Sequence, residues 1–375
     1  MISVWEKETF FAPQDIIIAG SGFVGLWSAF YLKKRNPKLR ITILDKGIIP
    51  TGASTRNAGF ACFGSLTELL ADEQKMGTDR MLHLVEMRYK GLEKIKTVFG
   101  KKDIDIDMCG GYELFTKEEN LLTDDIEEQV DYLNELLKEI VKGNTYKLAD
   151  KKIGSFGFKK ISHLIRNNQE GYLHSGKLIK VLLQYVQRQG VQVLNNLEIK
   201  NFEKVNDRIE IETNQPIRFS ADQLLICING FAKKLLPQLD VEPARGQVIL
   251  TSPIDTLPWK GTFHYNQGFY YFRNLGKRVL LGGARNLAVN DERTFSLQTS
   301  EIIQQELERF LNEVIIPDKK FSIELRWSGT MGIGGEKMPI QKEISPGVFC
   351  CVRMNGMGVA LAPFLGEKTA KMMIG

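Results

Sequence analysis

Hydrophobic residues near the amino terminus form a short, unbroken run that predicts a buried strand. The run from Ile16 to Ile18 is entirely β-branched. A continuous apolar run of this length suits a strand buried on both faces, as in a parallel sheet. After a glycine-rich turn, apolar residues recur at helical spacing over 26–32, and "KKRNP" ends that helix. The segment "RITILDK" then predicts a second strand, which ends at Asp45.

Related patterns occur further along the chain. Residues 171–194 have the pattern of a helix followed by a strand. Residues 121–141 and 298–315 have the pattern of amphipathic helices, and we expect both to cover a sheet. The strand-like runs "YYF" and "RVLLGG" flank "RNLGK", which predicts a hairpin with a five-residue connection.

The glycine-rich turn has the spacing Gly20-x-Gly22-x-x-Gly25 between the first strand and its helix. In a dinucleotide site, the first glycine permits the tight turn, the second admits the pyrophosphate, and the third lets the helix pack on the strand. The helix amino terminus offers free N–H groups to phosphate. Asp45 follows Gly20 by 25 residues and can accept the hydroxyls of an adenosine ribose. The pattern predicts a dinucleotide site but leaves FAD and NAD both open, and an ordinary glycine-rich turn is the alternative.

The segment after the second strand, "IIPTGASTRNAGFACFG", separates these two cofactors. It resembles the G-A-S-x-R-N-x-G stretch of the D-amino-acid-oxidase-like superfamily of FAD-dependent oxidoreductases, which includes glycine, sarcosine and glutamylputrescine oxidases. The residues that match are Gly52, Ala53, Ser54, Arg56, Asn57 and Gly59. In that superfamily the stretch wraps the pyrophosphate and approaches the flavin ring, whereas it has no role in an NAD-dependent dehydrogenase. The resemblance therefore implies FAD.

The resemblance extends over nearly the whole chain and is closest to the glutamylputrescine-oxidase-like branch. Further matching segments are "GYLHSGKLIKVLLQYVQRQGVQVL", "ADQLLICINGFAKKLLP", "EPARGQVILTSP", "GFYYFRNLGKRVLLGGARN", "RWSGTMG" and "NGMGVALAPFLGEKTAKMM". His174 and Ser175 depart from the family, which often has Asp-Pro there. The implied fold is α/β, with a Rossmann-type, glutathione-reductase-like FAD-binding domain and a discontinuous antiparallel-sheet substrate domain. We expect 1–75, 150–240 and 325–375 to form the FAD-binding domain, and 76–149 and 241–324 to form the substrate domain.

The resemblance also implies which residues hold FAD. The predicted cofactor-binding residues are Gly20, Gly22, Phe23, Val24, Gly25, Asp45, Lys46, Ser54, Arg56, Asn57, Ala58, Gly59, Asn229, Gly230, Gly356, Met357, Gly358 and Val359. If the last helix runs from Val359, its amino-terminal amides and dipole can stabilise negative charge at the O2 edge of the reduced ring. A tight strand-to-helix turn is the alternative explanation for Gly356 and Gly358.

The candidate catalytic residues lie in and just before the predicted hairpin. They are Tyr270, Tyr271, Arg273 and His264. Neighbouring residues of a strand point to opposite faces, so at most one of the two tyrosines can face a substrate and the other belongs to the core. No cluster of metal-binding spacing is present, and we expect no metal site.

The chain departs from the family where glycine and D-amino-acid oxidases have an arginine that binds the substrate carboxylate. Met331 stands at that place. A second arginine, near the final glycine segment, is also absent unless Arg353 substitutes for it, and Arg245 can be a substrate anchor or form a structural salt bridge. An amine, or a substrate with a remote carboxylate, fits this pattern better than a simple α-amino acid. No cysteine lies between Trp327 and Phe349, where sarcosine oxidases attach their flavin, so we expect non-covalent FAD.

Composition narrows the possible functions and locations of the protein. The net charge of +5 is spread along the chain, which argues against nucleic-acid binding. Five cysteines without a CxxC pair favour a reduced, cytoplasmic protein, and no signal peptide or membrane span is expected. We predict an FAD-dependent oxidoreductase that acts on a small molecule, oxidising a C–N bond of an amine or N-substituted amino compound by hydride transfer to flavin N5. The alternatives are oxidation of a C–OH bond in a 2-hydroxy acid or polyol, and a non-catalytic flavin-binding protein. The oligomeric state stays open.

Overall fold

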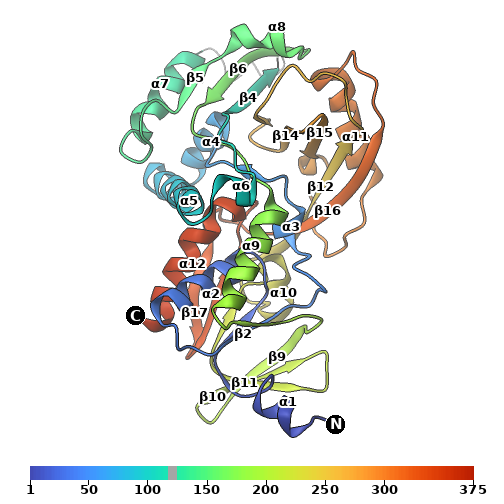
Figure 1. The fold of residues 1–375 in the computed structure, drawn as a ribbon. Coiled ribbons are helices and arrows are strands. Elements are labelled where there is room, and N and C mark those ends of the chain that lie inside the picture. Colours follow the sequence, from blue (N-terminus) through green and yellow to red (C-terminus); the bar gives the residue numbers. More distant parts are fainter. Residues whose placement is uncertain (117–124) are drawn as a thin grey trace. The chain divides into compact units, whose positions relative to one another are not determined.

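The computed structural model describes residues 1–116 and 125–375, and these form two compact units (Figure 1). The first unit consists of 1–56, 175–244 and 330–375. The second unit consists of 57–174 and 245–329. Both units are built from mixed α/β structure, which confirms the predicted fold class.

The first unit contains a sheet with the strand order β17-β18-β11-β1-β2-β8, and β10 and β9 continue it beside β11. Its strands are β1 (Gln14–Ala19), β2 (Ile41–Leu44), β8 (Gln192–Leu194), β9 (Ile199–Val205), β10 (Arg208–Thr213), β11 (Arg218–Ile226), β17 (Ile340–Ser345) and β18 (Val348–Val352). Strand β1 is parallel to both β2 and β11, and β2 is parallel to β8. Ile16, Ile17 and Ile18 are at most 1% exposed, as the unbroken apolar run predicts.

Helices α2, α9 and α12 lie side by side against this sheet (Figure 1). The helices of the first unit are α1 (Val4–Glu8), α2 (Phe23–Arg35), α3 (Ala53–Arg56), α9 (Ser175–Arg188), α10 (Ala232–Leu235) and α12 (Gly358–Ile374). Phe30 of α2 packs on Tyr185 of α9, with ring centroids 4.6 Å apart. A Cβ at Gly366 would lie 2.7 Å from the backbone carbon of Trp27, so glycine permits close packing of α12 on α2.

The carboxyl ends of three parallel strands meet at one edge of this sheet. Gly20 follows β1, Asp45 follows β2, and Asn229 follows β11. Ligands of open α/β sheets bind at this edge, where loops leave the strands. The fold therefore gathers three of the predicted cofactor-binding segments.

The second unit contains a sheet with the order β16-β12-β15-β14-β13-β4-β6-β5, and a separate short pair, β3-β7. Its strands are β3 (Phe60–Ala61), β4 (Gly111–Thr116), β5 (Tyr146–Leu148), β6 (Ile161–Asn167), β7 (Gly171–Tyr172), β12 (Glu242–Thr251), β13 (Thr262–Tyr265), β14 (Tyr270–Leu275), β15 (Arg278–Gly283) and β16 (Ile323–Ile333). The first residues of β12, 242–244, and the last residues of β16, 330–333, belong to the first unit. Its helices are α4 (Leu66–Met76), α5 (Thr78–Val98), α6 (Lys101–Ile104), α7 (Ile126–Leu137), α8 (Ile153–Phe156) and α11 (Glu301–Phe310). Pairing is antiparallel between β13, β14 and β15, whereas β4 and β13 run parallel.

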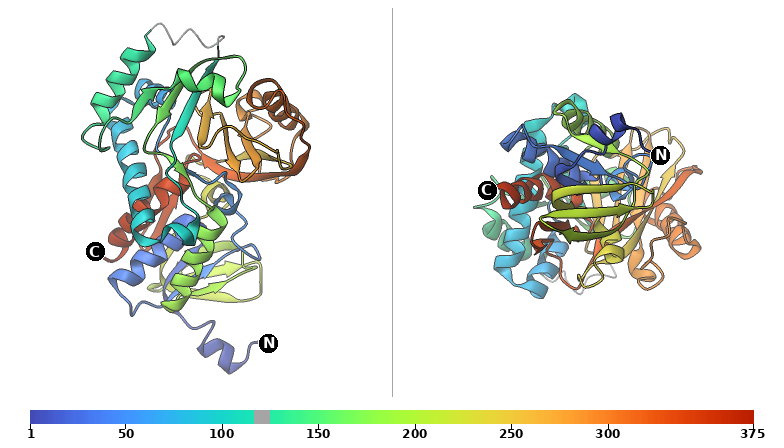
Figure 2. Two further views of the ribbon diagram at one scale, coloured as in Figure 1. Left: turned by 45° about the horizontal axis from the view of Figure 1, so that its top comes forward. Right: turned by 90° about the horizontal axis from the view of Figure 1, so that it is seen from below.

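An aromatic core covers one face of β13 and β14. Phe263 and Phe272 stack with ring centroids 4.6 Å apart, and Trp259 packs edge-on against both rings. Helix α11 closes this core from the side of β13–β15 with Ile303 and Leu307 (Figure 2). The opposite face of the same strands carries three of the four catalytic candidates.

Several details differ from the sequence-based expectations. The hairpin between β14 and β15 turns over two residues instead of five, because Leu275 pairs directly with Arg278. The first four residues of the amphipathic stretch 121–141 lie outside the described residues, and α7 occupies its centre. Helix α11 continues into a π-helical turn over Leu311–Ile315. In the described part of the chain, no helix is long and apolar enough to cross a bilayer.

The two units begin and end at other residues than the predicted domains do. Residues 57–75 and 150–174, expected in the FAD-binding domain, belong to the second unit. The reason is strand pairing: β3 pairs with β7, and β6 pairs with β4. Residues 241–244 belong to the first unit and 325–329 to the second.

Candidate functional site

The glycine turn of the first unit leaves the start of α2 open. Gly20 has φ +96°, and a Cβ at Gly25 would lie 2.0 Å from the Gly20 carbonyl oxygen. A Cβ at Gly22, the N-cap residue of α2, would meet only the Ser54 hydroxyl, at 3.1 Å. The first turn of α2 carries no acidic residue. A bare backbone at a helix amino terminus without acidic side chains fits a pyrophosphate.

Asp45 is held in place by the same turn. One carboxylate oxygen, Oδ2, accepts hydrogen bonds from the Ser21 N–H at 2.8 Å and the Ser21 hydroxyl at 2.6 Å. The other, Oδ1, accepts from the Gly47 N–H at 2.8 Å. Because a carboxylate oxygen accepts two hydrogen bonds, Oδ1 keeps a position for a ribose hydroxyl. The neighbouring Lys46 is exposed, and its ammonium lies over the Phe231 ring.

The GASTRNAG stretch contributes to both units. In the first unit, Ser54 accepts a hydrogen bond from the Phe23 N–H at 2.9 Å, so this stretch contacts the start of α2. Arg56 donates from Nε to the Thr51 carbonyl oxygen at 2.9 Å. In the second unit, the Asn57 side chain accepts from the Gly59 N–H at 2.8 Å. Gly59 has φ +74°, which is a left-handed conformation that favours glycine.

The last predicted cofactor-binding segment contains the start of α12. The Asn229 side chain accepts a hydrogen bond from the Met354 N–H at 3.1 Å. A Cβ at Gly230 would lie 2.2 Å from the Met331 carbonyl oxygen, so β16 passes too close for a side chain there. Helix α12 begins at Gly358, one residue before the predicted Val359, with Met357 as its N-cap and no acidic residue in its first turn. This helix start can face developing negative charge.

The two hairpin tyrosines lie on opposite faces of β14, and Tyr270 lies in the core. Its ring packs on Phe310 at 5.0 Å, and its hydroxyl donates to Glu306 at 2.9 Å. Tyr270 is 4% exposed. Strand alternation turns its side chain to the aromatic core, so Tyr270 is the tyrosine of the pair that belongs to the core, and Tyr271 is left as the candidate for substrate contact.

Tyr271 occupies the other face, where its ring lies across Gly282 of β15. A Cβ at Gly282 would lie 2.5 Å from a ring carbon and 2.7 Å from the Tyr271 hydroxyl. Burial raises the pKa of Tyr271 to about 12, and the positive charge of Arg285 opposes that rise. The Tyr271 hydroxyl is consequently a proton donor at neutral pH.

Arg285 follows β15 in the turn at Arg285–Leu287 and was not among the sequence candidates. Its Nη1 is buried, and no hydrogen-bond partner for that atom occurs among residues 1–116 and 125–375. Burial lowers the pKa of Arg285, and the Glu292 carboxylate opposes this effect. A buried, unsatisfied guanidinium N–H next to Tyr271 is a ready donor to an anionic ligand.

Arg273 shares this face but contacts the backbone. Its Nε donates to the Ala58 carbonyl oxygen at 2.7 Å, and its guanidinium lies 4.6 Å from the centre of the Tyr172 ring. Burial lowers the pKa of Arg273 to about 10. A Cβ at Gly59 would come within 3.2 Å of Nη2. Arg273 therefore positions the segment 58–59.

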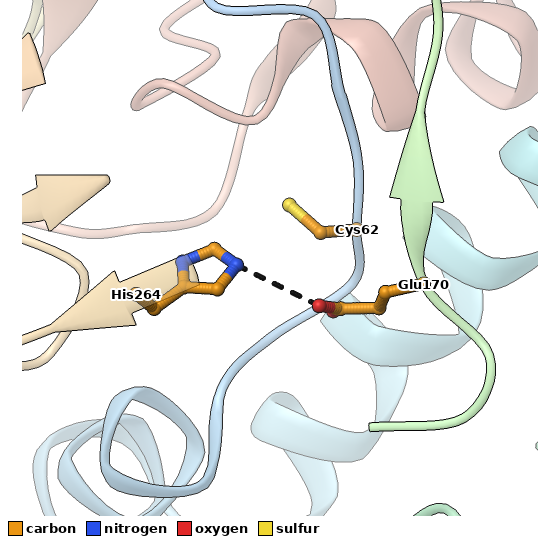
Figure 3. Close-up of side chains that lie close together, drawn as sticks. All are labelled: Cys62, Glu170 and His264. Atoms are coloured by element: carbon orange, nitrogen blue, oxygen red, sulfur yellow. Dashed lines mark ion pairs between the residues drawn. The ribbon is translucent and has the colours of Figure 1, made fainter. Parts of the chain in front are cut away.

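His264 lies on β13 opposite Tyr271, and it faces the partly buried Cys62 and the buried Glu170 (Figure 3). Its Nε2 is 3.6 Å from the Glu170 carboxylate. Burial works against a charged imidazole, yet Cys62 and Glu170 outweigh burial and raise the pKa of His264 well above its usual value. Glu113, the residue paired with His264 on β4, is also buried, and burial raises its pKa against hydrogen bonds from Thr67 and Ser65.

The other two arginines considered as carboxylate anchors form internal ion pairs. Arg245 donates from Nε and Nη2 to the two carboxylate oxygens of Glu292, both at 2.7 Å. Arg353 pairs with Asp240 at 2.5 Å and donates to the Met338 carbonyl oxygen. Of the two readings of Arg245, the structural salt bridge is confirmed.

Sequence reasoning missed Glu113, Glu170 and Arg285. The signal for Glu113 was an acidic residue within the strand-like run "GYELF". Glu170 directly precedes Gly171, where a Cβ would lie 2.0 Å from the Asp107 carbonyl oxygen. Arg285 stands after "LLGG", and only the bare Gly282 beneath Tyr271 makes its position notable.

Comparisons with known proteins agree over nearly the full length. Residues 15–372 match the family model DAO, described as FAD dependent oxidoreductase. The chain is 25% identical to "Probable oxidoreductase OrdL" of Rhizobium meliloti (strain 1021), covering 96% of this chain and 83% of that protein. L-proline dehydrogenase from P. horikoshii has a similar fold, with a TM-score of 0.78, 17% identity, and coverage of 96% of this chain and 93% of that one. Glycine oxidase from Geobacillus kaustophilus has a TM-score of 0.76 at 17% identity, covering 97% of this chain and 96% of that one.

Proposed function

The chain belongs to the DAO family of FAD-dependent oxidoreductases, and we propose that it oxidises the C–N bond of an amine or N-substituted amino compound that carries an anionic group. The observation that carries the proposal is the buried Nη1 of Arg285, which has no hydrogen-bond partner among the described residues and whose positive charge acts on the Tyr271 hydroxyl. The solved relatives named above act on amino acids, which agrees with this substrate class.

Bound FAD supplies the hydride acceptor at its N5. In this proposal the first unit holds the cofactor through three features. The start of α2 at Gly22 receives the pyrophosphate, Asp45 binds the ribose, and the start of α12 at Gly358 stabilises negative charge. We also infer that FAD is held without a covalent bond, so acid precipitation should leave a colourless pellet.

In the second unit, Tyr271 and Arg285 contact the substrate. Both residues present hydrogen-bond donors. Arg285 presents guanidinium N–H groups, and Tyr271 presents its O–H group because its pKa of about 12 keeps the hydroxyl protonated at neutral pH. Two donors that include a guanidinium suit a carboxylate or another anion. Oxidation of a neutral amine does not require a strong base, and donors of this kind orient the substrate without one.

Oxidation of a C–OH bond is the competing reaction, and it requires a proton acceptor for the hydroxyl. His264 is the candidate acceptor on this face. Its Nε2 is directed at Glu170 and Cys62, as Figure 3 shows. That orientation favours the C–N reaction.

The five cysteines are all free thiols, which supports a reducing cytoplasmic location.

The test compares Arg285→Gln with Arg278→Gln. Arg278 lies on β15, the strand that precedes the turn of Arg285, but it forms a partly exposed ion pair with Glu324 at 2.7 Å. Substrates are offered as pairs, an N-alkyl amino acid and the matching amine without the carboxylate. A charge-assisted hydrogen bond contributes about 1.5–3 kcal/mol, so Arg285→Gln should raise KM for the anionic substrate roughly 10- to 150-fold. The amine without the carboxylate should be affected little.

If Arg285→Gln changed KM equally for both substrates, Arg285 would not be the residue that binds the anionic group. Activity on hydroxy acids alone would replace the C–N reaction by its competitor. Arg278→Gln should leave KM unchanged for both substrates.

A further inference from the structure

Three side chains from distant segments meet in the second unit: Cys62 after β3, Glu170 before β7 and His264 on β13 (Figure 3). One ligand atom from each lies within 4.8 Å of the others. We propose that this cluster is a zinc-binding site. The inference goes beyond the proposed function and stands independently of it, because metal binding can be measured without substrate. No metal site was expected from the sequence.

The strongest indication is the Nε2 atom of His264. The residue is 6% exposed, and within the described ranges this nitrogen has no hydrogen-bond partner. A buried imidazole nitrogen without a partner is costly, and a metal ion would satisfy it. The nitrogen is directed at the carboxylate of Glu170, which is itself fully buried.

The distance between these two ligands fits a shared ion. The separation of 3.6 Å between His264 Nε2 and Glu170 Oε2 is too long for a good hydrogen bond. Zinc binds nitrogen and oxygen at about 2.0–2.2 Å, so an ion in contact with both atoms would subtend an angle of about 120°. That angle is close to the tetrahedral arrangement that zinc adopts.

Surrounding groups fix both ligands in position. The other Glu170 oxygen, Oε1, accepts hydrogen bonds from the Phe63 N–H at 2.9 Å and the Gly64 N–H at 3.2 Å. Phe60 packs edge-on against the His264 ring, with centroids 5.2 Å apart. Oriented ligands of this kind are typical of built metal sites.

Charge balance agrees with a divalent ion. Arg88 lies 3.9 Å from the Cys62 sulfur, and its charge is compensated by an ion pair with Glu68 at 2.9 Å. A Cys62 thiolate and the Glu170 carboxylate would together neutralise Zn²⁺, with His264 bound as neutral imidazole. Binding would release the thiol proton of Cys62, and any proton on His264, to solvent.

The ligand types select the metal. Thiolate, imidazole and carboxylate together suit zinc, whereas magnesium and calcium prefer oxygen ligands alone. Three protein ligands leave a fourth position for water or another small molecule, as in zinc sites that are not purely structural.

The test uses the FAD-loaded protein, equilibrated with ZnCl₂ and passed through a desalting column. Zinc per chain is measured by inductively coupled plasma mass spectrometry, and the ligands by zinc X-ray absorption. We expect one zinc per chain, with a sulfur shell at about 2.3 Å and nitrogen or oxygen at about 2.0–2.2 Å. Cys62→Ser should remove the sulfur shell and weaken zinc binding by at least roughly 100-fold.

Cys109→Ser is the matched control, since Cys109 is a half-buried thiol of the same unit outside the cluster. It should keep the zinc content of the unaltered chain. His264→Gln is the second ligand variant, and circular dichroism verifies that each variant is folded. Substoichiometric zinc in the unaltered protein, or equal zinc affinity in Cys62→Ser and Cys109→Ser, would overturn the proposal. The cluster would then be an ion pair between His264 and Glu170.

Discussion

At the scale of single residues, glycines define where ligands can approach. Gly22 lies at the start of α2 with φ −68°, a conformation open to any residue, and little protein occupies the space that its side chain would fill. Glycine is therefore not required there for folding. Its role is to keep that space clear for the pyrophosphate.

Gly22→Val should therefore abolish FAD binding while the protein stays folded. The added Cβ would meet only the Ser54 hydroxyl within the protein, and in this proposal the valine side chain would occupy the path of the phosphates. The measurement is the flavin-to-protein absorbance ratio after gel filtration, with circular dichroism as a check of folding. Gly154→Ala is the control, because a Cβ there meets nothing within 4 Å. A yellow, stoichiometric Gly22→Val protein would show that the phosphates bind elsewhere.

Gly282 gives a second prediction at this scale. A Cβ at Gly282 would displace the Tyr271 ring, which is the flexible side of that contact. Gly282→Ala should therefore keep the fold but lower kcat/KM about 10- to 100-fold, as expected for a misplaced substrate contact. Tyr271→Phe should lose activity to a similar or smaller extent. Unchanged kinetics in both variants would place the substrate away from Tyr271.

The sequence predicted the backbone features at this scale better than the side-chain clusters. Gly20, Gly25 and Asp45 can be recognised from their spacing in the sequence. The structure places them at the carboxyl edge of adjacent strands. Cys62 and His264 are separated by most of the second unit's chain. A single sequence carries no signal for such a meeting, because it depends on tertiary pairing.

At the scale of elements, a buried ion pair links β12 to the segment before α11. Glu292 is fully buried and accepts hydrogen bonds from Arg245, Gln247 and Ser300. Burial opposes ionisation of Glu292, but these hydrogen bonds lower its pKa overall. The stabilisation is therefore present above the unfolded-state pKa of about 4.3 and is lost as pH falls through the lower folded value.

Glu292→Gln should destabilise the protein by about 3 kcal/mol at neutral pH, since it leaves the Arg245 charge buried without a counter-charge. The difference from the unaltered chain should shrink as the pH falls below about 4. Thermal unfolding followed by circular dichroism at several pH values measures both effects. Glu324→Gln, which breaks a surface ion pair with Arg278, should change the melting temperature little. A constant difference across the pH range would contradict the assignment.

Element types were predicted well where periodicity was strong. The buried β1 and the amphipathic α9 and α11 follow directly from their apolar spacing. The predicted hairpin connection was too long. The residues "RNL" have the composition of a loop, but Asn274 and Leu275 still pair with β15. Pairing at the carboxyl end of β14 therefore continues through residues whose composition resembles a loop.

At the scale of the whole molecule, the chain divides between two units, each assembled from separated segments. The resemblance implies discontinuous domains, and the limits of the second unit near 57 and 174 depend on the pairings β3–β7 and β4–β6. Such long-range pairings are invisible to local patterns. The cofactor motifs lie mainly in the first unit, and the substrate candidates lie in the second.

The central claim is that bound FAD accepts a hydride from the carbon of a C–N bond. The most direct measurement is an anaerobic reduction of the purified yellow protein, followed by its visible spectrum. The compounds are amines, N-alkyl amino acids, γ-glutamylated amines, D-amino acids and 2-hydroxy acids. The account predicts bleaching of the flavin band by one class of amino compound, with release of ammonia or an amine after hydrolysis of the product. Bleaching by hydroxy acids alone, or by none of these compounds, would contradict it.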